Sequence, residues 1–137
     1  MLRPVRPPVA ASAAAALSAA LALAGCANGP TDEQQVAATV RSFSAAADAR
    51  DYATLCSRIL APALVSDVTA IGLPCEKALA RGLGKVRAPR LAIGAITVDG
   101  DRASVEVRTS AANEKPSSDT LELVRVRGSW RIASLGR

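Results

Sequence analysis

The chain has 137 residues, enough for one domain, and half of them are hydrophobic, although only Phe43, Tyr52 and Trp130 are aromatic. Its formal net charge is +5 and it contains no histidine. The missing histidine excludes Ser-His-Asp, Cys-His and Asp-His catalysis. A nucleic-acid partner is not expected either, because the sequence has no basic patch with interleaved aromatic residues.

The first 25 residues have the pattern of a secretory signal sequence. Arg3 and Arg6 form a positive n-region, and an apolar stretch of 16 residues follows, from Val9 to Ala24. That stretch is shorter than the roughly 20 residues that span a bilayer as a helix. We therefore expect residues 1–25 to form a signal-peptide helix that is removed from the mature protein.

The four residues Leu23-Ala24-Gly25-Cys26 resemble the bacterial lipobox. This resemblance implies a lipid, such as palmitate, on the Cys26 thiol and cleavage after Gly25. The alternative is an ordinary or uncleaved signal that contains a cysteine by chance. We expect a lipoprotein anchored to the extracytoplasmic face of the cell membrane.

Residues 26–31 then form a tether, and residues 32–137 form the folded domain. The five steps from Cys26 to Thr31 reach at most about 17 Å, which holds the domain against the membrane surface. Removing Arg3 and Arg6 leaves fifteen basic residues against twelve acidic ones, so the net charge of the mature chain is +3.

Three cysteines are an odd number for a secreted protein. Lipidation uses Cys26 and leaves Cys56 and Cys75, which we expect to form a disulfide in an oxidising compartment. The alternative is two separate buried thiols. A metal site is not expected, because a Cys pair without histidine lacks the four ligands that zinc prefers.

The first half of the mature chain has helical patterns. Thr31 and Gln34 have capping-box spacing, and the helix that they start has one apolar face, formed by Val36, Val40, Phe43 and Ala47. A short helix is expected at 52–60, and another begins at Pro62. After the break at 72–74, residues 75–83 form a last helix that ends at Gly84.

The second half has strand patterns. Residues 91–98 are followed by the hairpin signal Asp99-Gly100. Residues 103–108 alternate between apolar and polar side chains, and 111–118 are expected to form a polar loop. Two further strands are expected at 121–127 and 129–134.

We expect the last hairpin to place Val126 opposite Trp130, with a turn at residues 127–129. This register places both apolar side chains on the core face. It requires a bulge near Leu123, and it brings Arg125 opposite Arg131. Helices followed by an antiparallel meander indicate an α+β fold, with helices over one face of a curved sheet.

Four segments also resemble a known family: "DARDYATLC" (48–56), "PCEKALA" (74–80), "VDGDRASVEV" (98–107) and "RGSWRIASL" (127–135). In this order, after a capped helix, they are similar to small bacterial lipoproteins of the nuclear-transport-factor-2-like, or ketosteroid-isomerase-like, superfamily. The resemblance implies a cone-shaped domain with a pocket between helices and sheet. It also implies that Cys56 and Cys75 pair.

The superfamily includes enzymes, ligand binders and assembly domains, so the fold does not define the function. Its isomerases use an aspartate base and a tyrosine, but Tyr52 stands at a helix start, where tyrosine more often packs than catalyses. The stretch "GLGKV" (82–86) lacks the spacing of a phosphate-binding loop.

Charged residues on the strands provide the remaining candidate sites. Glu106 and Glu122 are expected on neighbouring polar faces, close to Arg108, Arg125 and Arg131. The three arginines could form an anion patch, the two acids could serve a small enzyme, or all five could form a solvated outer face.

On the last helix, Lys77, Arg81 and Lys85 form either a solvated face or a contact with acidic head groups. We expect a non-catalytic lipoprotein, without a cofactor, that binds an envelope protein or a small apolar ligand in its cone. The alternatives are an enzyme that uses pocket carboxylates and a structural envelope component.

Overall fold

The computed structural model describes residues 29–136. The expected signal peptide, Cys26 and the first part of the tether lie outside the described residues. Helices come first and strands second, as predicted from the sequence. The elements are α1 (Asp32–Asp48), α2 (Tyr52–Thr54), the π-helical turn η1 (Leu55–Ile59), α3 (Pro62–Ala70), α4 (Cys75–Leu83), β1 (Arg90–Asp99), β2 (Arg102–Ala111), β3 (Glu114–Val126) and β4 (Ser129–Ser134).

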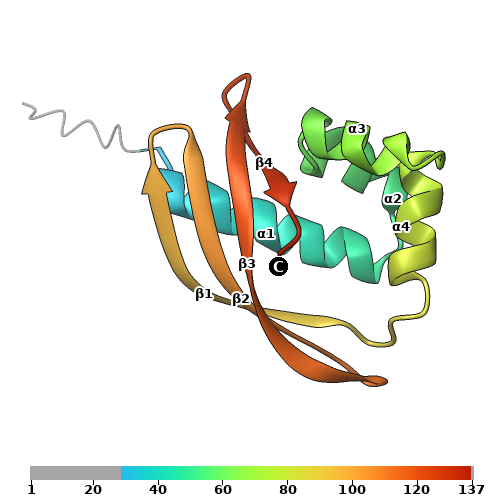
Figure 1. The fold of residues 1–137 in the computed structure, drawn as a ribbon. Helices are drawn as coiled ribbons and strands as arrows, with labels where there is room; N and C mark the ends of the chain where they lie inside the picture. Colours follow the sequence, from blue (N-terminus) through green and yellow to red (C-terminus); the bar gives the residue numbers. More distant parts are fainter. Residues whose placement is uncertain (1–28, 137) are drawn as a thin grey trace, which may run out of the picture.

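The strands form one antiparallel sheet in the order β1-β2-β3-β4. In Figure 1, α1 crosses one face of this curved sheet, while α2, α3 and α4 lie near the C-terminal end of α1. The predicted α+β class is therefore confirmed. The register of β1 shifts between Ile93 and Ile96, and a Cβ atom on Gly94 would lie only 3.2 Å from the carbonyl oxygen of Glu106. The absent side chain lets the two strands approach closely at this bulge.

The core lies between α1, the short helices and the inner face of the sheet. Each large aliphatic side chain buried there contributes roughly 1.5–3 kcal/mol to stability. The largest fully buried side chains are Val36, Val40, Leu55, Leu60, Val105, Leu123 and Ile132. These side chains fill the middle of the cone.

Both ends of α1 are capped. At the start, Gln34 N donates to Thr31 Oγ1 at 3.2 Å, and Thr31 N donates to Gln34 Oε1 at 2.9 Å, which confirms the predicted capping box. At the end, Asp51 N donates to the Ala46 carbonyl and Arg50 N to the Ala47 carbonyl, the two hydrogen bonds of a Schellman motif.

The outer edge of β4 is covered by the segment after η1. Leu60 forms a bridge with Ile132, and Ala61 N donates to the Ile132 carbonyl at 2.8 Å. Arg131 Nη1 also donates to the Ser57 carbonyl at 2.9 Å. The bond from Ala61 uses a β4 carbonyl that would otherwise be exposed at a sheet edge, and the Arg131 bond ties the strand to η1.

The predicted register of the last hairpin is wrong. Val126 pairs with Ser129, and Arg125 pairs with Trp130, so the turn consists of Arg127 and Gly128 only. Both turn residues have positive φ, 51° and 79°, as a type I′ turn requires. A register shift does occur beside Leu123, but β3 keeps its alternation, so Arg125 rather than Val126 shares a face with Trp130.

The predicted polar loop at 111–118 is also wrong. β2 extends to Ala111 and β3 begins at Glu114, so only a two-residue turn separates them. Pro116 is tolerated in this strand because it lies at a register shift, on a part of β3 that pairs with β2 but not with β4.

Candidate functional site

A cavity of about 190 Å³ lies at the end of the cone where α1 ends. We call it the end cavity. Its apolar lining comes from Phe43, Ala47, Leu83, Val86, Pro89 and Leu91. An apolar cavity of roughly 150 Å³ can hold benzene, whereas drug-sized ligands need about 300 Å³ or more. The end cavity therefore has room for one ring or a short alkyl chain.

A second cavity, of about 240 Å³, adjoins the first and shares Ala47, Leu83, Val86 and Pro89 with it. We call it the linker cavity, because residues 86–89 of the α4–β1 linker line it. Its other lining residues are Asp48, Arg50, Arg87 and Ala88. The two cavities thus adjoin the same linker.

The linker is held by the turn between β2 and β3. Asn113 Nδ2 donates to the Lys85 carbonyl, and Arg87 N donates to Asn113 Oδ1, both at 2.9 Å. Ala112 N also donates to the Arg87 carbonyl at 2.8 Å. This side-chain amide therefore fixes the backbone that separates α4 from β1.

Two non-glycine residues of the linker cavity have left-handed backbones. Arg50 has φ 57° and Ala88 has φ 47°; among residues 29–136, Arg127 is the other non-glycine residue with positive φ. This conformation costs a residue with a side chain about 1 kcal/mol or more. Backbone strain of this kind concentrates at functional sites.

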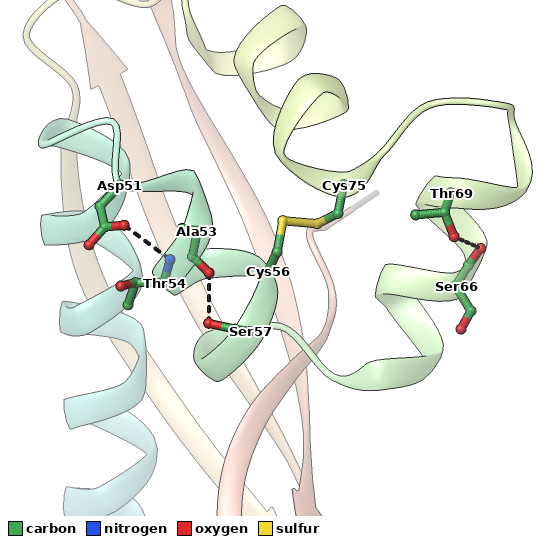
Figure 2. Close-up of a disulfide and its surroundings, with 8 residues drawn as sticks. All are labelled: Asp51, Ala53, Thr54, Cys56, Ser57, Ser66, Thr69 and Cys75. Atoms are coloured by element: carbon green, nitrogen blue, oxygen red, sulfur yellow. Dashed lines mark hydrogen bonds between the residues drawn. A yellow bond between two sulfur atoms is a disulfide. The ribbon is translucent and has the colours of Figure 1, made fainter.

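The predicted disulfide is confirmed. Cys56 in η1 is bonded to Cys75 at the start of α4, with 6.1 Å between their Cα atoms. Figure 2 shows the bond joining these two helical segments, with α3 in the loop that it closes. No residue of α3 is fully buried, and its contacts with the core come from the partly buried Leu64 and Val65. The disulfide therefore restrains a segment that only partly buried side chains hold against the core.

The three arginines of the expected anion patch do not come together. Arg125 lies on the inner face, where its guanidinium carbon is 4.5 Å from the centre of the Trp130 ring. Arg131 lies at the β4 edge and donates to Ser57. Arg108 alternates with the buried Val107 and is exposed on the outer face. The expected pairing of Arg125 with Arg131 is also wrong, because Arg125 lies opposite Trp130 and Arg131 lies opposite Val124.

Glu106 and Glu122 lie outside the cone. Both line a broad, open concavity on the outer face of the sheet, together with Arg102 and Asp119. Neither lines the end cavity or the linker cavity. These acids are therefore not placed to act on a molecule held inside the cone.

Tyr52 packs beside the end of α4. Its hydroxyl is buried, has no hydrogen-bond partner in the described part of the chain, and lies 3.8 Å from the Cβ position of Gly84. Lys77, Arg81 and Lys85 are exposed.

Between residues 29 and 136, no group of three or more carboxylate, cysteine or histidine side chains could hold a metal ion. No helix in the same range is long and apolar enough to cross a membrane. Sequence patterns did not locate the end cavity and the linker cavity. Their lining comes from α1, α4, the linker and three strands, so only the tertiary fold assembles it.

Neither a family model nor a curated protein matches this chain. Solved structures do resemble it. A nuclear-transport-factor-2-like (NTF2-like) protein of unknown function from Silicibacter pomeroyi is 22% identical, with a TM-score of 0.53, over 73% of this chain and 88% of that one. A similar protein of unknown function from Shewanella baltica is 16% identical, with a TM-score of 0.54, over 77% and 94%.

A putative NTF2-like transpeptidase from Campylobacter jejuni is 16% identical, with a TM-score of 0.51, over 76% of this chain and 99% of that one. At these identities the likeness concerns the fold and not the activity. With its helices over a curved four-stranded sheet, the chain has the NTF2-like fold.

Proposed function

We propose that this protein is an extracytoplasmic lipoprotein, anchored to the cell membrane through Cys26, whose cone binds a small apolar ligand without catalysis. The end cavity carries the binding part of this proposal. It opens to solvent on one side, its lining includes aliphatic side chains and the aromatic ring of Phe43, and its volume suits a small apolar group. The lipobox-like residues Leu23 to Cys26 support the anchor.

The alternative of an enzyme that uses pocket carboxylates has less support. Glu106 and Glu122 would need to face a common substrate, and they line the outer face of the sheet instead. The acids that do line the cavities, Asp48 and Glu114, belong to different cavities.

The anchor is tested by intact-mass analysis of protein extracted from membranes. We expect a mature chain that begins at a diacylated or triacylated Cys26. An unmodified mass of the full 137-residue chain would contradict the anchor and leave the cavity proposal standing.

The cavity is tested by titrating 1-octanol, an uncharged apolar probe, into the purified full chain in a calorimeter. We expect saturable binding with one site per chain. Ala47→Leu should abolish it, because Ala47 lines both cavities. Ala45→Leu is the matched control, because Ala45 lies on the same helix but is exposed. Equal loss in both variants, or no saturable binding in the wild type, would contradict the proposal.

A further inference from the structure

We propose that the ligand is an amphiphile: a short apolar body that carries one anionic group. This inference rests on the proposed function, since it names the chemical class of the molecule in the end cavity. The apolar body lies in the end cavity, and the anion is held by cationic side chains around the two cavities. We call these four side chains, Arg50, Arg87, Arg90 and Lys115, the cationic rim.

The cationic rim surrounds both cavities. Arg90 and Lys115 line the end cavity, and Arg50 and Arg87 line the adjoining linker cavity. The acids that line these cavities are Glu114 and Asp48, one in each. Four positive charges against two negative ones leave an excess of positive charge beside an apolar floor, the arrangement that complements an amphiphilic anion.

These cations are not used to hold the fold. Within residues 29–136, salt bridges to carboxylates are formed by Arg125 alone, at the opposite end of α1. Side-chain hydrogen bonds from the cationic rim are also absent in that range. No ion pair or side-chain hydrogen bond within residues 29–136 therefore explains why position 50 is an arginine.

The backbone conformation of Arg50 is unusual for an arginine. Arg50 is the C′ residue of α1, the left-handed position in the Schellman motif where glycine is usual. An arginine here costs stability relative to glycine. The sequence keeps it at the rim of a cavity, where its charge can act on a ligand.

Arg127 provides a matched control. It also has a left-handed backbone, with φ 51° against 57° for Arg50, it is also exposed, and it lies in the β3–β4 turn and lines neither cavity. Arg50→Gly and Arg127→Gly therefore remove the same charge and relieve the same strain. They differ in their position relative to the cavities.

The experiment measures the affinities of octanoate, octyl phosphate, 1-octanol and inorganic phosphate for the purified full chain by calorimetry. We expect at least one of the two amphiphilic anions to bind roughly fivefold or more tightly than 1-octanol, with an advantage that decreases at high salt. Arg50→Gly should lower the affinity for that anion roughly threefold to fivefold and leave the affinity for 1-octanol unchanged. Arg127→Gly should change neither affinity.

The outcomes are distinguishable. Tighter binding of octanoate or of octyl phosphate supports the inference and identifies the head group as carboxylate or phosphate. Equal affinity for the anions and 1-octanol, or equal effects of the two arginine variants, would overturn it while the proposed function stands. Inorganic phosphate that binds as tightly as octyl phosphate would also overturn it, because the apolar part would then be irrelevant. If 1-octanol and both anions fail to bind, the proposed function fails as well.

Discussion

At the scale of single residues, Arg125 joins three parts of the molecule. Its guanidinium group lies 2.8 Å from Asp32 Oδ1 at the start of α1 and 3.1 Å from Asp101 Oδ1 in the β1–β2 turn, and it stacks over Trp130. The hydrogen bond to Asp32 is the main reason that the pKa of Arg125 is raised above its usual value. The two carboxylates therefore favour the charged form of the guanidinium group.

Arg125→Gln should lower the melting temperature by several degrees, because it removes both ion pairs and the contact with the indole ring. In 1 M salt the difference from wild type should narrow, since exposed ion pairs are screened. Thermal unfolding followed by circular dichroism measures both effects. Arg127→Gln is the control and should have little effect; an equal effect would contradict a specific role for Arg125.

Asp51 is a second residue whose charge matters. Its Oδ1 accepts a hydrogen bond from Thr54 N at 3.0 Å, as Figure 2 shows, and this bond is the main reason that its pKa is lowered. A carboxyl whose pKa falls on folding adds stability above its unfolded pKa of about 3.9, and that stability disappears as the pH falls through the lower folded value.

Asp51→Asn should therefore be less stable than wild type at pH 5–7, by an amount that hardly changes over that interval. The difference should decrease as the pH falls below about 4. Urea unfolding at several pH values measures it. A difference that stays constant down to pH 2 would show that the carboxyl charge is not the cause.

At the scale of elements, the disulfide compensates for weak packing of α3. The Cys56–Cys75 bond spans 19 positions in the sequence, and the segment that it closes includes all of α3. Fixing a loop of this length stabilises a domain by roughly 3 kcal/mol in the chain-entropy model. Because α3 contributes only partly buried side chains to the core, we expect this helix to depend most on the bond.

Replacing both cysteines, as in Cys56→Ser with Cys75→Ser, should lower the free energy of unfolding by about 3 kcal/mol. Amide hydrogen exchange should accelerate in α3 before it does so in α1, which contributes Val36 and Val40 to the core. Mass spectrometry of exchanged peptides measures this order. Uniform acceleration along the chain would indicate that the bond acts on global stability alone.

At the scale of the whole molecule, local sequence patterns predicted the order of helices and strands but not every pair of residues that face each other in the sheet. The helix boundaries near Thr31, Pro62 and Gly84 followed from caps and breakers next to them in the sequence. The register of the last hairpin did not follow, because Leu123 and Val124 are both apolar and either could face the core. The observed register brings Arg125 to Asp32, which lies at the start of α1, far away in the sequence but adjacent in space.

Contacts between residues far apart in the sequence also explain why the start of β3 and the two cavities were not predicted. Residues 114–120 are polar because that part of β3 buries little surface, so the sequence resembles a loop although it pairs with β2. The cavities and the cationic rim join residues from position 43 to 117. Burial and contacts over such separations leave no periodic signal.

The proposed anchor leads to a prediction for the whole molecule. Exchanging residues 1–26 for a signal peptide that is cleaved in the ordinary way should move the protein from the membrane fraction to the soluble extracytoplasmic fraction. Cell fractionation and immunoblotting measure this, with the native chain as control. A protein that stays in the membrane fraction would show that the folded domain itself binds there.

The hydrogen bonds of Asn113 to the linker make the three hairpin turns differ in their tolerance of insertions. The turns at 100–101 and 127–128 have glycines with positive φ and line neither cavity. The turn at 112–113 is bonded to the linker through Asn113 and Ala112. An epitope tag or a reporter domain inserted at 127–128 therefore leaves the cavity walls intact, whereas the same insertion at 112–113 detaches one of them. The choice of graft site decides whether an engineered version of this protein still reports on its ligand.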